Sequence, residues 1–265
     1  MTTCLLDSAA GSVGPDVYSG GMAKQHQEFL QESGQDILSD MSGYDFSGNE
    51  RFSDDRPDPA APGGSILFAL PGTLVDWDPR RALVGQYPDG VVDMVLDPED
   101  PWGFACVRRQ INLGVDPQQA LADYETTQGP AVAWVVRVCL ENYTLTVKGL
   151  FPGASELLED LCRAGLTLWG LSATTRQLIE SVSEVLSPLS ALKGVLISSQ
   201  EHLDLSDSLF YRLALRRFAI SPGHTIFVDA DPEHVAMADR LGMEGIIAHD
   251  ISSLRRLLRQ RGIAC

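Results

Sequence analysis

The sequence predicts an α/β protein built on a Rossmann-like parallel sheet of about five strands, with helices on both faces of the sheet. Three observations support this fold class. From Ser65 onward, short apolar runs alternate with amphipathic segments, as a parallel sheet with crossover helices requires. After the first of these runs, residues 80 to 150 read as a small helical insertion. Residues 1 to 64 lack sustained apolar periodicity and predict a disordered acidic tail.

The tail carries 11 acidic and 3 basic residues and is rich in Gly, Ser, Asp and Gln. Such a composition does not bury enough apolar surface to offset the entropy lost on ordering. A short helix over Ala23–Ser33 is compatible with the pattern, and Asp36–Met41 places apolar residues among acids, as short binding segments do. Two interpretations follow: a tail that only solubilises the protein, or a segment that binds a protein partner.

Five apolar runs have the length and composition of buried strands. They are Ile66–Leu70, Thr167–Leu171, Gly194–Ser198, Thr225–Val228 and Gly245–Ala248. The last four are spaced so that one crossover helix fits after each of them. The predicted helices are Ala154–Ala164, Arg176–Leu186, Ser208–Phe218, Glu233–Leu241 and Ile251–Gln260.

Three further segments, Trp102–Gln110, Pro117–Thr126 and Ala131–Leu140, predict the helices of the insertion. The chain is therefore expected to divide into a tail over 1–64, a core domain over 65–79 and 151–265, and a helical cap domain over 80–150.

Composition narrows the function classes. The formal net charge is −16, which disfavours nucleic acid and membrane surfaces as partners because both are anionic. The five cysteines never stand in a Cys-x-x-Cys spacing, so a zinc site or a disulfide framework is not expected. No apolar run reaches the roughly 18 to 20 residues that a membrane span needs. We expect a cytoplasmic protein.

The segment Ser65–Asp76 resembles the first strand and loop of haloacid dehalogenase (HAD)-like hydrolases, in which an apolar strand runs into Asp-x-Asp-Gly-Thr-Leu. The resemblance extends over Ser65–Cys265 and is closest to the small helical-cap subgroup that includes haloacid dehalogenases and glucose-1-phosphate phosphatases. Asp76–Arg80 and Phe151–Ala154 also match that subgroup. It implies the core domain and the helical cap described above.

The resemblance also implies that both catalytic aspartates of the first motif are missing. In the family the first aspartate attacks the substrate and the second transfers a proton; here Ala69 and Pro71 hold those positions. A methyl group is not a nucleophile, and a pyrrolidine ring does not exchange a proton.

The second motif of the family ends a strand with a hydroxyl residue that helps to hold the substrate anion. Ser172 keeps this hydroxyl, whereas Ala173 replaces an asparagine and Arg176 adds a positive charge nearby. With Thr73 of the first motif, these residues are the candidate ligand-binding set, and a small anionic ligand is the candidate partner. Equally, Ser172 and Thr175 fit a strand end and a helix N-cap with no ligand.

The third and fourth motifs have also lost charge. Leu205 stands where the family has a lysine that stabilises the transferring phosphoryl group. Asp229 is retained in the fourth motif, but Ala230 replaces the second aspartate. Asp229 is therefore a weak candidate ligand for magnesium, with Asp231 beside it; Asp231 also fits the N-cap of a helix that begins at Pro232. No cofactor is expected unless the site is functional, in which case it is Mg²⁺.

The leading functional hypothesis is a pseudoenzyme, a HAD-like protein without hydrolase activity that is retained for ligand binding, regulation or protein interaction. The alternative is an active phosphatase or dehalogenase of a small metabolite whose site has been rebuilt from Asp76, Asp229, Asp231 or His234. Asp78 is a further carboxylate near the lost nucleophile. In a third hypothesis the N-terminal tail folds on a protein partner.

Overall fold

The computed structural model describes residues 64–98, 100 and 103–265. Except for Gly64, the predicted acidic tail lies outside the described residues, and so do its Ala23–Ser33 and Asp36–Met41 segments. Trp102, where one insertion helix was expected to begin, lies outside them too.

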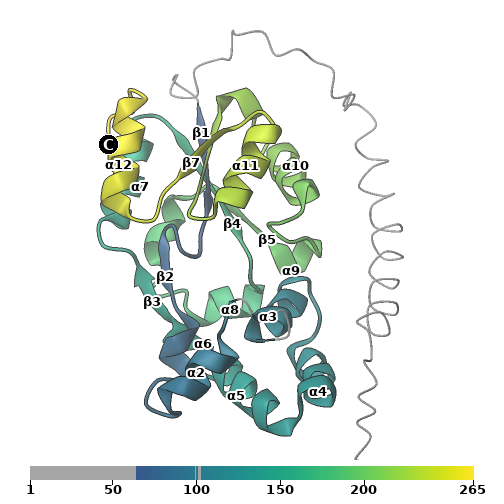
Figure 1. The fold of residues 1–265 in the computed structure, drawn as a ribbon. Helices are drawn as coiled ribbons and strands as arrows, with labels where there is room; N and C mark the ends of the chain where they lie inside the picture. Colours follow the sequence, from purple (N-terminus) through teal and green to yellow (C-terminus); the bar gives the residue numbers. More distant parts are fainter. Residues whose placement is uncertain (1–63, 99, 101–102) are drawn as a thin grey trace, which may run out of the picture. The chain divides into compact units, whose positions relative to one another are not determined.

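Within the described part of the chain, five parallel strands form one sheet in the order β5-β4-β1-β6-β7 (Figure 1). Their bounds are β1 Ser65–Ala69, β4 Thr167–Ser172, β5 Gly194–Ile197, β6 Thr225–Asp229 and β7 Glu244–Ile247. These bounds confirm the five predicted strands to within one residue. Strand β1 is central and completely buried, which explains why its sequence reads as a continuous apolar run.

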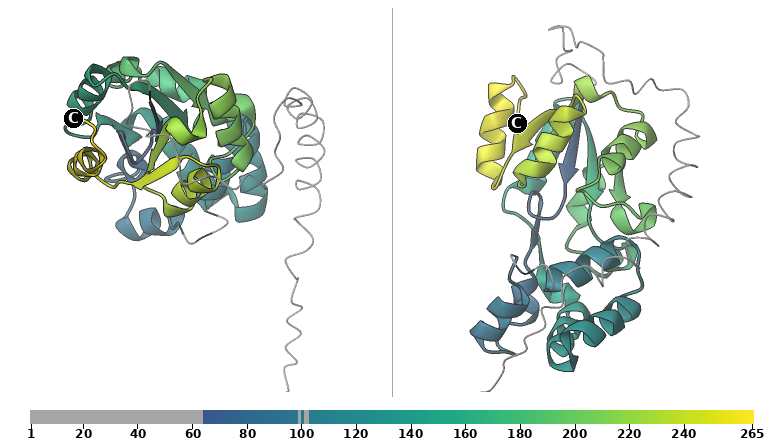
Figure 2. Two further views of the ribbon diagram at one scale, coloured as in Figure 1. Left: turned by 90° about the horizontal axis from the view of Figure 1, so that it is seen from above. Right: turned by 45° about the vertical axis from the view of Figure 1, so that its right-hand side comes forward.

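Helices cover both faces of the sheet, which confirms the α/β class (Figures 1 and 2). Helices α7 (Ala154–Arg163) and α12 (Ile251–Gln260) lie on one face, and α10 (Ser208–Arg217) and α11 (Pro232–Arg240) lie on the other. Alternate side chains of β1 point to opposite faces. Ile66 and Phe68 pack in the same buried cluster as Leu157 of α7 and Leu254 of α12.

The helix predicted over Arg176–Leu186 is wrong in length, because α8 spans only Arg176–Ser181. Ser181 donates its hydroxyl to the carbonyl of Leu178, and β-branched Val182 follows, so the local sequence favours leaving the helix. Pro188 then starts a short 3-10 helix, η2 (Ser187–Ala191). Two more short elements follow β5 and α10: α9 (Ser198–Glu201) and the 3-10 helix η3 (Pro222–His224).

An antiparallel pair of strands, β2 (Val75–Trp77) and β3 (Val147–Leu150), joins the sheet to the helical insertion. Between these strands lie η1 (Pro79–Ala82), α2 (Asp89–Val95), α3 (Phe104–Asn112), α4 (Pro117–Gln128), α5 (Pro130–Glu141) and α6 (Tyr143–Thr146). The sequence predicted α3, α4 and α5, but not the two strands, because three or four residues are too few to show a period.

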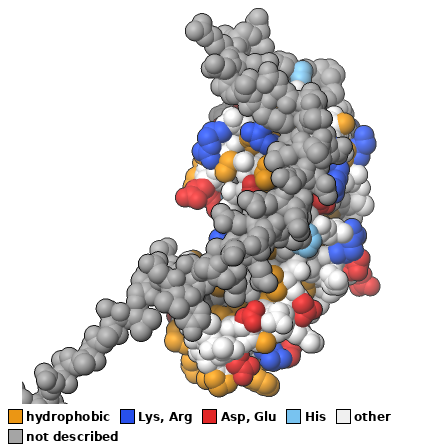
Figure 3. All heavy atoms as spheres, turned by 90° about the vertical axis from the view of Figure 1, so that its right-hand side faces the viewer, with side chains coloured by type: hydrophobic (Ala, Val, Ile, Leu, Met, Phe, Trp, Pro, Cys, Tyr) orange, Lys and Arg blue, Asp and Glu red, His pale blue; other side chains and the backbone are white. Residues whose placement is uncertain are grey.

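The insertion has its own buried cluster, which includes Leu83, Val92, Val107, Leu121 and Val136. It also exposes large hydrophobic side chains, including Val84, Met94, Trp134 and Leu145. In Figure 3 hydrophobic surface is visible at the lower end of the molecule, where the insertion lies. No helix in the described ranges is both long enough and apolar enough to cross a membrane.

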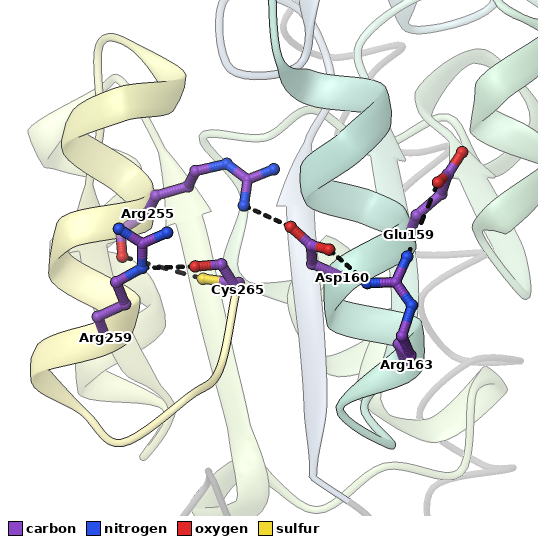
Figure 4. A network of polar contacts seen from close by, with 6 residues as sticks. All are labelled: Glu159, Asp160, Arg163, Arg255, Arg259 and Cys265. Carbon is purple, nitrogen blue, oxygen red and sulfur yellow. Dashed lines mark hydrogen bonds and ion pairs between the residues drawn. The ribbon is translucent and has the colours of Figure 1, made fainter.

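Ion pairs fasten α12 to α7 (Figure 4). Asp160 on α7 accepts hydrogen bonds from Arg255 of α12 and from Arg163, each at 2.6 Å. These two hydrogen bonds hold the pKa of Asp160 below its ordinary value. Arg259 donates to the carbonyl of Cys265 at 2.5 Å, which returns the C-terminal residues to the same helix.

Candidate functional site

The carboxyl ends of β4, β1 and β6 bring three predicted site residues to one edge of the sheet. In the parallel register, Ala69 of β1 lies opposite Leu171 of β4, and Phe68 lies opposite Val228 of β6. Ala69, Ser172 and Asp229 therefore end three neighbouring strands, and each is at most 5% exposed. Binding sites of open α/β sheets form at this edge.

The loop after β1 keeps its shape without carboxylates. The amide groups of Leu74 and Val75 donate to the carbonyl of Leu70, and Gly72 adopts a φ of 82°, which favours glycine. Ala69 contributes only a methyl group to the strand end, and Pro71 has no donor. Thr73 is buried, and its hydroxyl has no hydrogen-bond partner among the described residues.

Both carboxylate oxygens of Asp229 are engaged within the protein. Its Oδ1 accepts the backbone N–H of Asp231 at 3.1 Å, and its Oδ2 accepts from Nδ1 of His234 at 2.8 Å. Burial disfavours the imidazolium of His234, but the hydrogen bond to Asp229 and the charges of Asp229, Asp231 and Asp204 outweigh it, so the pKa of His234 is raised. A protonatable ring thus lies on the carboxylate that was the candidate metal ligand.

Asp231 serves as a helix cap. Its carboxylate accepts the backbone N–H of Glu233 at 2.8 Å, at the start of α11, which confirms the capping interpretation. Asp229, Asp231 and His234 lie together, but they do not form a metal site. Within the described residues, no group of three or more His, Cys, Asp or Glu side chains has the arrangement to hold a metal ion.

The position expected for the phosphoryl-stabilising lysine is part of the apolar core. Leu205 is buried, and Tyr211 of α10 packs edge-on against Phe227 at 5.3 Å between ring centroids. The hydroxyl of Tyr211 is buried and has no hydrogen-bond partner among the described residues. Burial and the nearby charges of Asp229, Asp231 and Asp204 raise the pKa of Tyr211, so this phenol stays neutral.

The other carboxylates from which an active site could have been rebuilt also have partners within the protein. Asp76 is paired with Arg81, with 2.7 Å between Oδ1 and Nη2. Asp78 caps η1 by accepting the N–H of Arg80 at 2.9 Å. Neither carboxylate is available as a free nucleophile.

A cavity of about 370 Å³ opens beside the ends of β1, β4 and β5, next to α8 and the β2–β3 strands. Its aliphatic lining includes Leu70, Val75, Val147, Ile179, Val182 and Val195. Its polar lining consists of Tyr143, Ser172, Thr174, Arg176 and Ser183. Two of the predicted ligand-binding residues, Ser172 and Arg176, therefore share one cavity.

The remaining predicted site residues lie elsewhere. Ala173 lines a second, much smaller cavity of about 30 Å³, and neither Thr73 nor Asp229 lines either cavity. Thr175 accepts the N–H of Leu178 at 3.2 Å, which confirms it as the N-cap of α8.

Sequence reasoning missed Arg108, which α3 of the insertion directs toward the core. Its guanidinium lies over the ring of Trp77, 5.2 Å from the centroid, and lines the smaller cavity with Tyr143 and Thr174. Burial lowers the pKa of Arg108, and no carboxylate in the described ranges lies within ion-pair distance of it. An amphipathic helix with Arg on its half-buried face is common, so no sequence signal singles this arginine out.

Two contacts connect the insertion to the core around the site. The hydroxyl groups of Tyr143 and Thr174 lie 3.4 Å apart, and Nδ1 of His202 lies 2.9 Å from the carbonyl oxygen of Leu113. Next to the second contact, Gly114 has a φ of 91°, and an added Cβ would lie 2.6 Å from Nδ1 of His202.

Comparison with solved structures identifies the fold. The chain superposes on a protein described as a predicted HAD-like family hydrolase from Porphyromonas gingivalis, with a TM-score of 0.57 and 18% identity, over 75% of this chain and 99% of that chain. It is also similar to a HAD family enzyme from Bacteroides thetaiotaomicron, with a TM-score of 0.59 and 16% identity, over 74% and 98% of the two chains.

That enzyme has also been solved with magnesium and inorganic phosphate, including a mutant in which an aspartate is replaced by alanine. A dehalogenase matches with a TM-score of 0.51 and 18% identity, over 73% of this chain and 96% of that chain. No family model and no curated protein matches the sequence. At such low identity the comparisons establish the fold alone.

Proposed function

We propose that this chain, which has the HAD-like fold, is a non-hydrolytic protein that binds a small organic anion at the carboxyl edge of its sheet. The observation that carries the proposal is the methyl group of Ala69 at the end of β1, where hydrolases of this fold begin their chemistry. Covalent catalysis requires an activated nucleophile at that point, and no carboxylate of the described loop replaces it.

The surroundings of Ala69 support the same conclusion. Pro71 does not transfer a proton, and buried Leu205 does not stabilise developing charge. Each loss removes a different part of the reaction, so a single compensating residue does not restore it. A displacement of about 1 Å already costs on the order of a hundredfold in rate.

Magnesium does not fit the residues that remain. The ion needs a near-octahedral shell of oxygens, with one or two carboxylates as anchors. Asp229 is the remaining carboxylate of the motif, and both its oxygens accept hydrogen bonds from Asp231 and His234. Binding of a metal ion is therefore not part of the proposed function.

Anion binding is supported by two arginines that form no ion pair with a carboxylate of the described residues. Arg176 donates to the neutral amide oxygen of Gln200 at 2.9 Å, and Arg108 lies over Trp77. Both arginines line cavities that contain the hydroxyl groups of Tyr143 and Thr174. In a protein with a net charge of −16, two such arginines beside one strand end favour an anionic ligand.

The alternative is an active phosphatase or dehalogenase with a rebuilt site. In that case Asp229 with His234 is the pair best placed for acid–base work, since Asp76, Asp78 and Asp231 are engaged elsewhere. The alternative requires that this pair activate water without a metal.

The test is an assay of the full chain with p-nitrophenyl phosphate and with 2-chloropropionate, with and without magnesium. We expect no saturable turnover and no thermal stabilisation by magnesium. Saturable turnover that Asp229→Asn abolishes and that the control Asp123→Asn, a half-buried carboxylate on α4 of the insertion, leaves unchanged would establish the rebuilt site instead.

A further inference from the structure

The geometry of the larger cavity points to a ligand class: a monocarboxylate with an extended apolar body, whose carboxylate lies at Arg176 and whose body fills the cavity. This inference rests on the proposed binding function and specifies its ligand. It goes beyond the small anionic ligand that the motifs alone suggested, because it requires the apolar body.

The apolar body follows from the lining. Leu70 and Pro71 from the first loop, Val75 and Val147 from the β2–β3 strands, and Ile179 and Val182 from the α8 region face the same space. A volume of about 370 Å³ lies within the range of about 300 to 1,000 Å³ that small-molecule pockets occupy. Bare phosphate would leave most of this aliphatic surface in contact with water, whereas an apolar body would remove it from water.

The polar groups of the cavity are few and are gathered near the end of β4. Ser172 ends that strand, Thr174 follows it and contacts Tyr143, and Arg176 begins α8. Arg176 is exposed, so its guanidinium lies at the mouth of the cavity. It donates a hydrogen bond to the side-chain amide oxygen of Gln200, which is uncharged. An arginine fork pairs with a carboxylate through two parallel hydrogen bonds.

The local charge favours a monoanion over a phosphate dianion. Arg176 is the cation that lines this cavity, while Arg108 lies behind the wall formed by Trp77 and Tyr143. Because Arg176 is the one Lys or Arg side chain among the residues that line this cavity, a single carboxylate matches the single guanidinium.

The test is isothermal titration of the full chain with octanoate, octanamide and inorganic phosphate. Octanoate is expected to bind at least roughly tenfold more tightly than octanamide, since a charge-assisted hydrogen bond is lost with the amide. Phosphate is expected not to compete. Arg176→Gln should weaken octanoate binding by roughly tenfold, while the surface control Arg163→Gln, which lies on α7, should leave it unchanged.

A second variant tests the apolar body. Ile179→Trp adds bulk inside the cavity and should weaken octanoate more than acetate, and circular dichroism would establish that the variant is folded. Equal binding of octanoate and octanamide, binding that is unaffected by both variants, or no octanoate binding at all would overturn the ligand class. None of these binding results bears on whether the protein hydrolyses a substrate. The non-hydrolytic proposal is tested separately, by the turnover assay.

Discussion

Nδ1 of His234 lies 2.8 Å from Oδ2 of Asp229. The ring belongs to the first turn of α11, and the carboxylate ends β6. A protonatable ring that is part of the chain thus lies on one side of this aspartate. The carboxylate that was the candidate metal ligand is therefore one partner of a His–Asp contact within the protein.

This pair predicts a pH-dependent effect of His234→Gln on stability. The pKa of His234 is raised above its ordinary value of about 6.5, so the stabilisation is fully present below about pH 6.5 and is lost as pH rises through the raised value. Urea denaturation should show a loss of about 0.5 to 1 kcal/mol near pH 5.5 and a smaller loss near pH 8.5. The exposed His249→Gln is the control; a pH-independent loss would contradict the assignment.

Restoring the nucleophile alone should destabilise the protein. Ala69 is 2% exposed, and the strand that carries Asp229 runs beside β1, so Ala69→Asp places a second carboxylate in a buried position near the first. We expect a cost of about 2 to 4 kcal/mol in urea denaturation, with less for the uncharged Ala69→Asn.

Magnesium should not recover that loss, because Pro71, Leu205 and Ala230 remain unchanged in the variant. Denaturation with and without the ion is the measurement. Stabilisation of Ala69→Asp by magnesium would show that the remaining groups still form a metal site, contrary to the fit argued above.

Gly114→Ala should weaken the contact between the insertion and the core. The new methyl group would lie 2.6 Å from Nδ1 of His202 and 2.8 Å from the carbonyl oxygen of Ser199, at a φ of 91°. The expected cost is about 1 to 3 kcal/mol in urea denaturation. Gly90→Ala in α2, where an added Cβ meets nothing within 4 Å, is the matched control and should cost nothing.

Asp160→Asn should lower the melting temperature near neutral pH by weakening the link between α7 and α12 shown in Figure 4. The depressed pKa of Asp160 means that its stabilisation is present above the unfolded value of about 3.9 and disappears as pH falls through the folded value. Thermal scans of Asp160→Asn and Glu159→Gln, near neutral pH and again below the folded pKa of Asp160, measure the effect. If the two variants lower the melting temperature equally near neutral pH, the stabilising role of Asp160 is contradicted.

The sheet could be predicted because its three central strands, β1, β4 and β6, are buried on both faces and its helices carry regular apolar stripes. The apolar run Ile66–Leu70 and the stripe of Leu157, Leu158 and Leu161 are examples. The interpretation of Ala69 and Leu205 as positions of lost catalytic groups comes from the resemblance of the motifs and stays a prediction. Strands β2 and β3 were missed because they are too short for a period.

The features that define the site depend on tertiary placement. His234 could be assigned to the first turn of a helix, but its pairing with Asp229 depends on how α11 meets β6. The position of Arg108 over the ring of Trp77 depends on how the insertion folds, so the sequence does not indicate it. The cavity is lined by Ile179 within α8 and by Val182 and Leu186 beyond its end at Ser181, which lies five residues earlier than the periodicity indicated.

The two strands β2 and β3 are both the covalent route to the insertion and a wall of the larger cavity, through Val75, Trp77 and Val147. A ligand in the cavity would therefore contact the strands that connect the insertion to the sheet as well as the sheet itself. Ligand binding and the position of the insertion are then thermodynamically linked, because a ligand that favours one position is bound more tightly in that position.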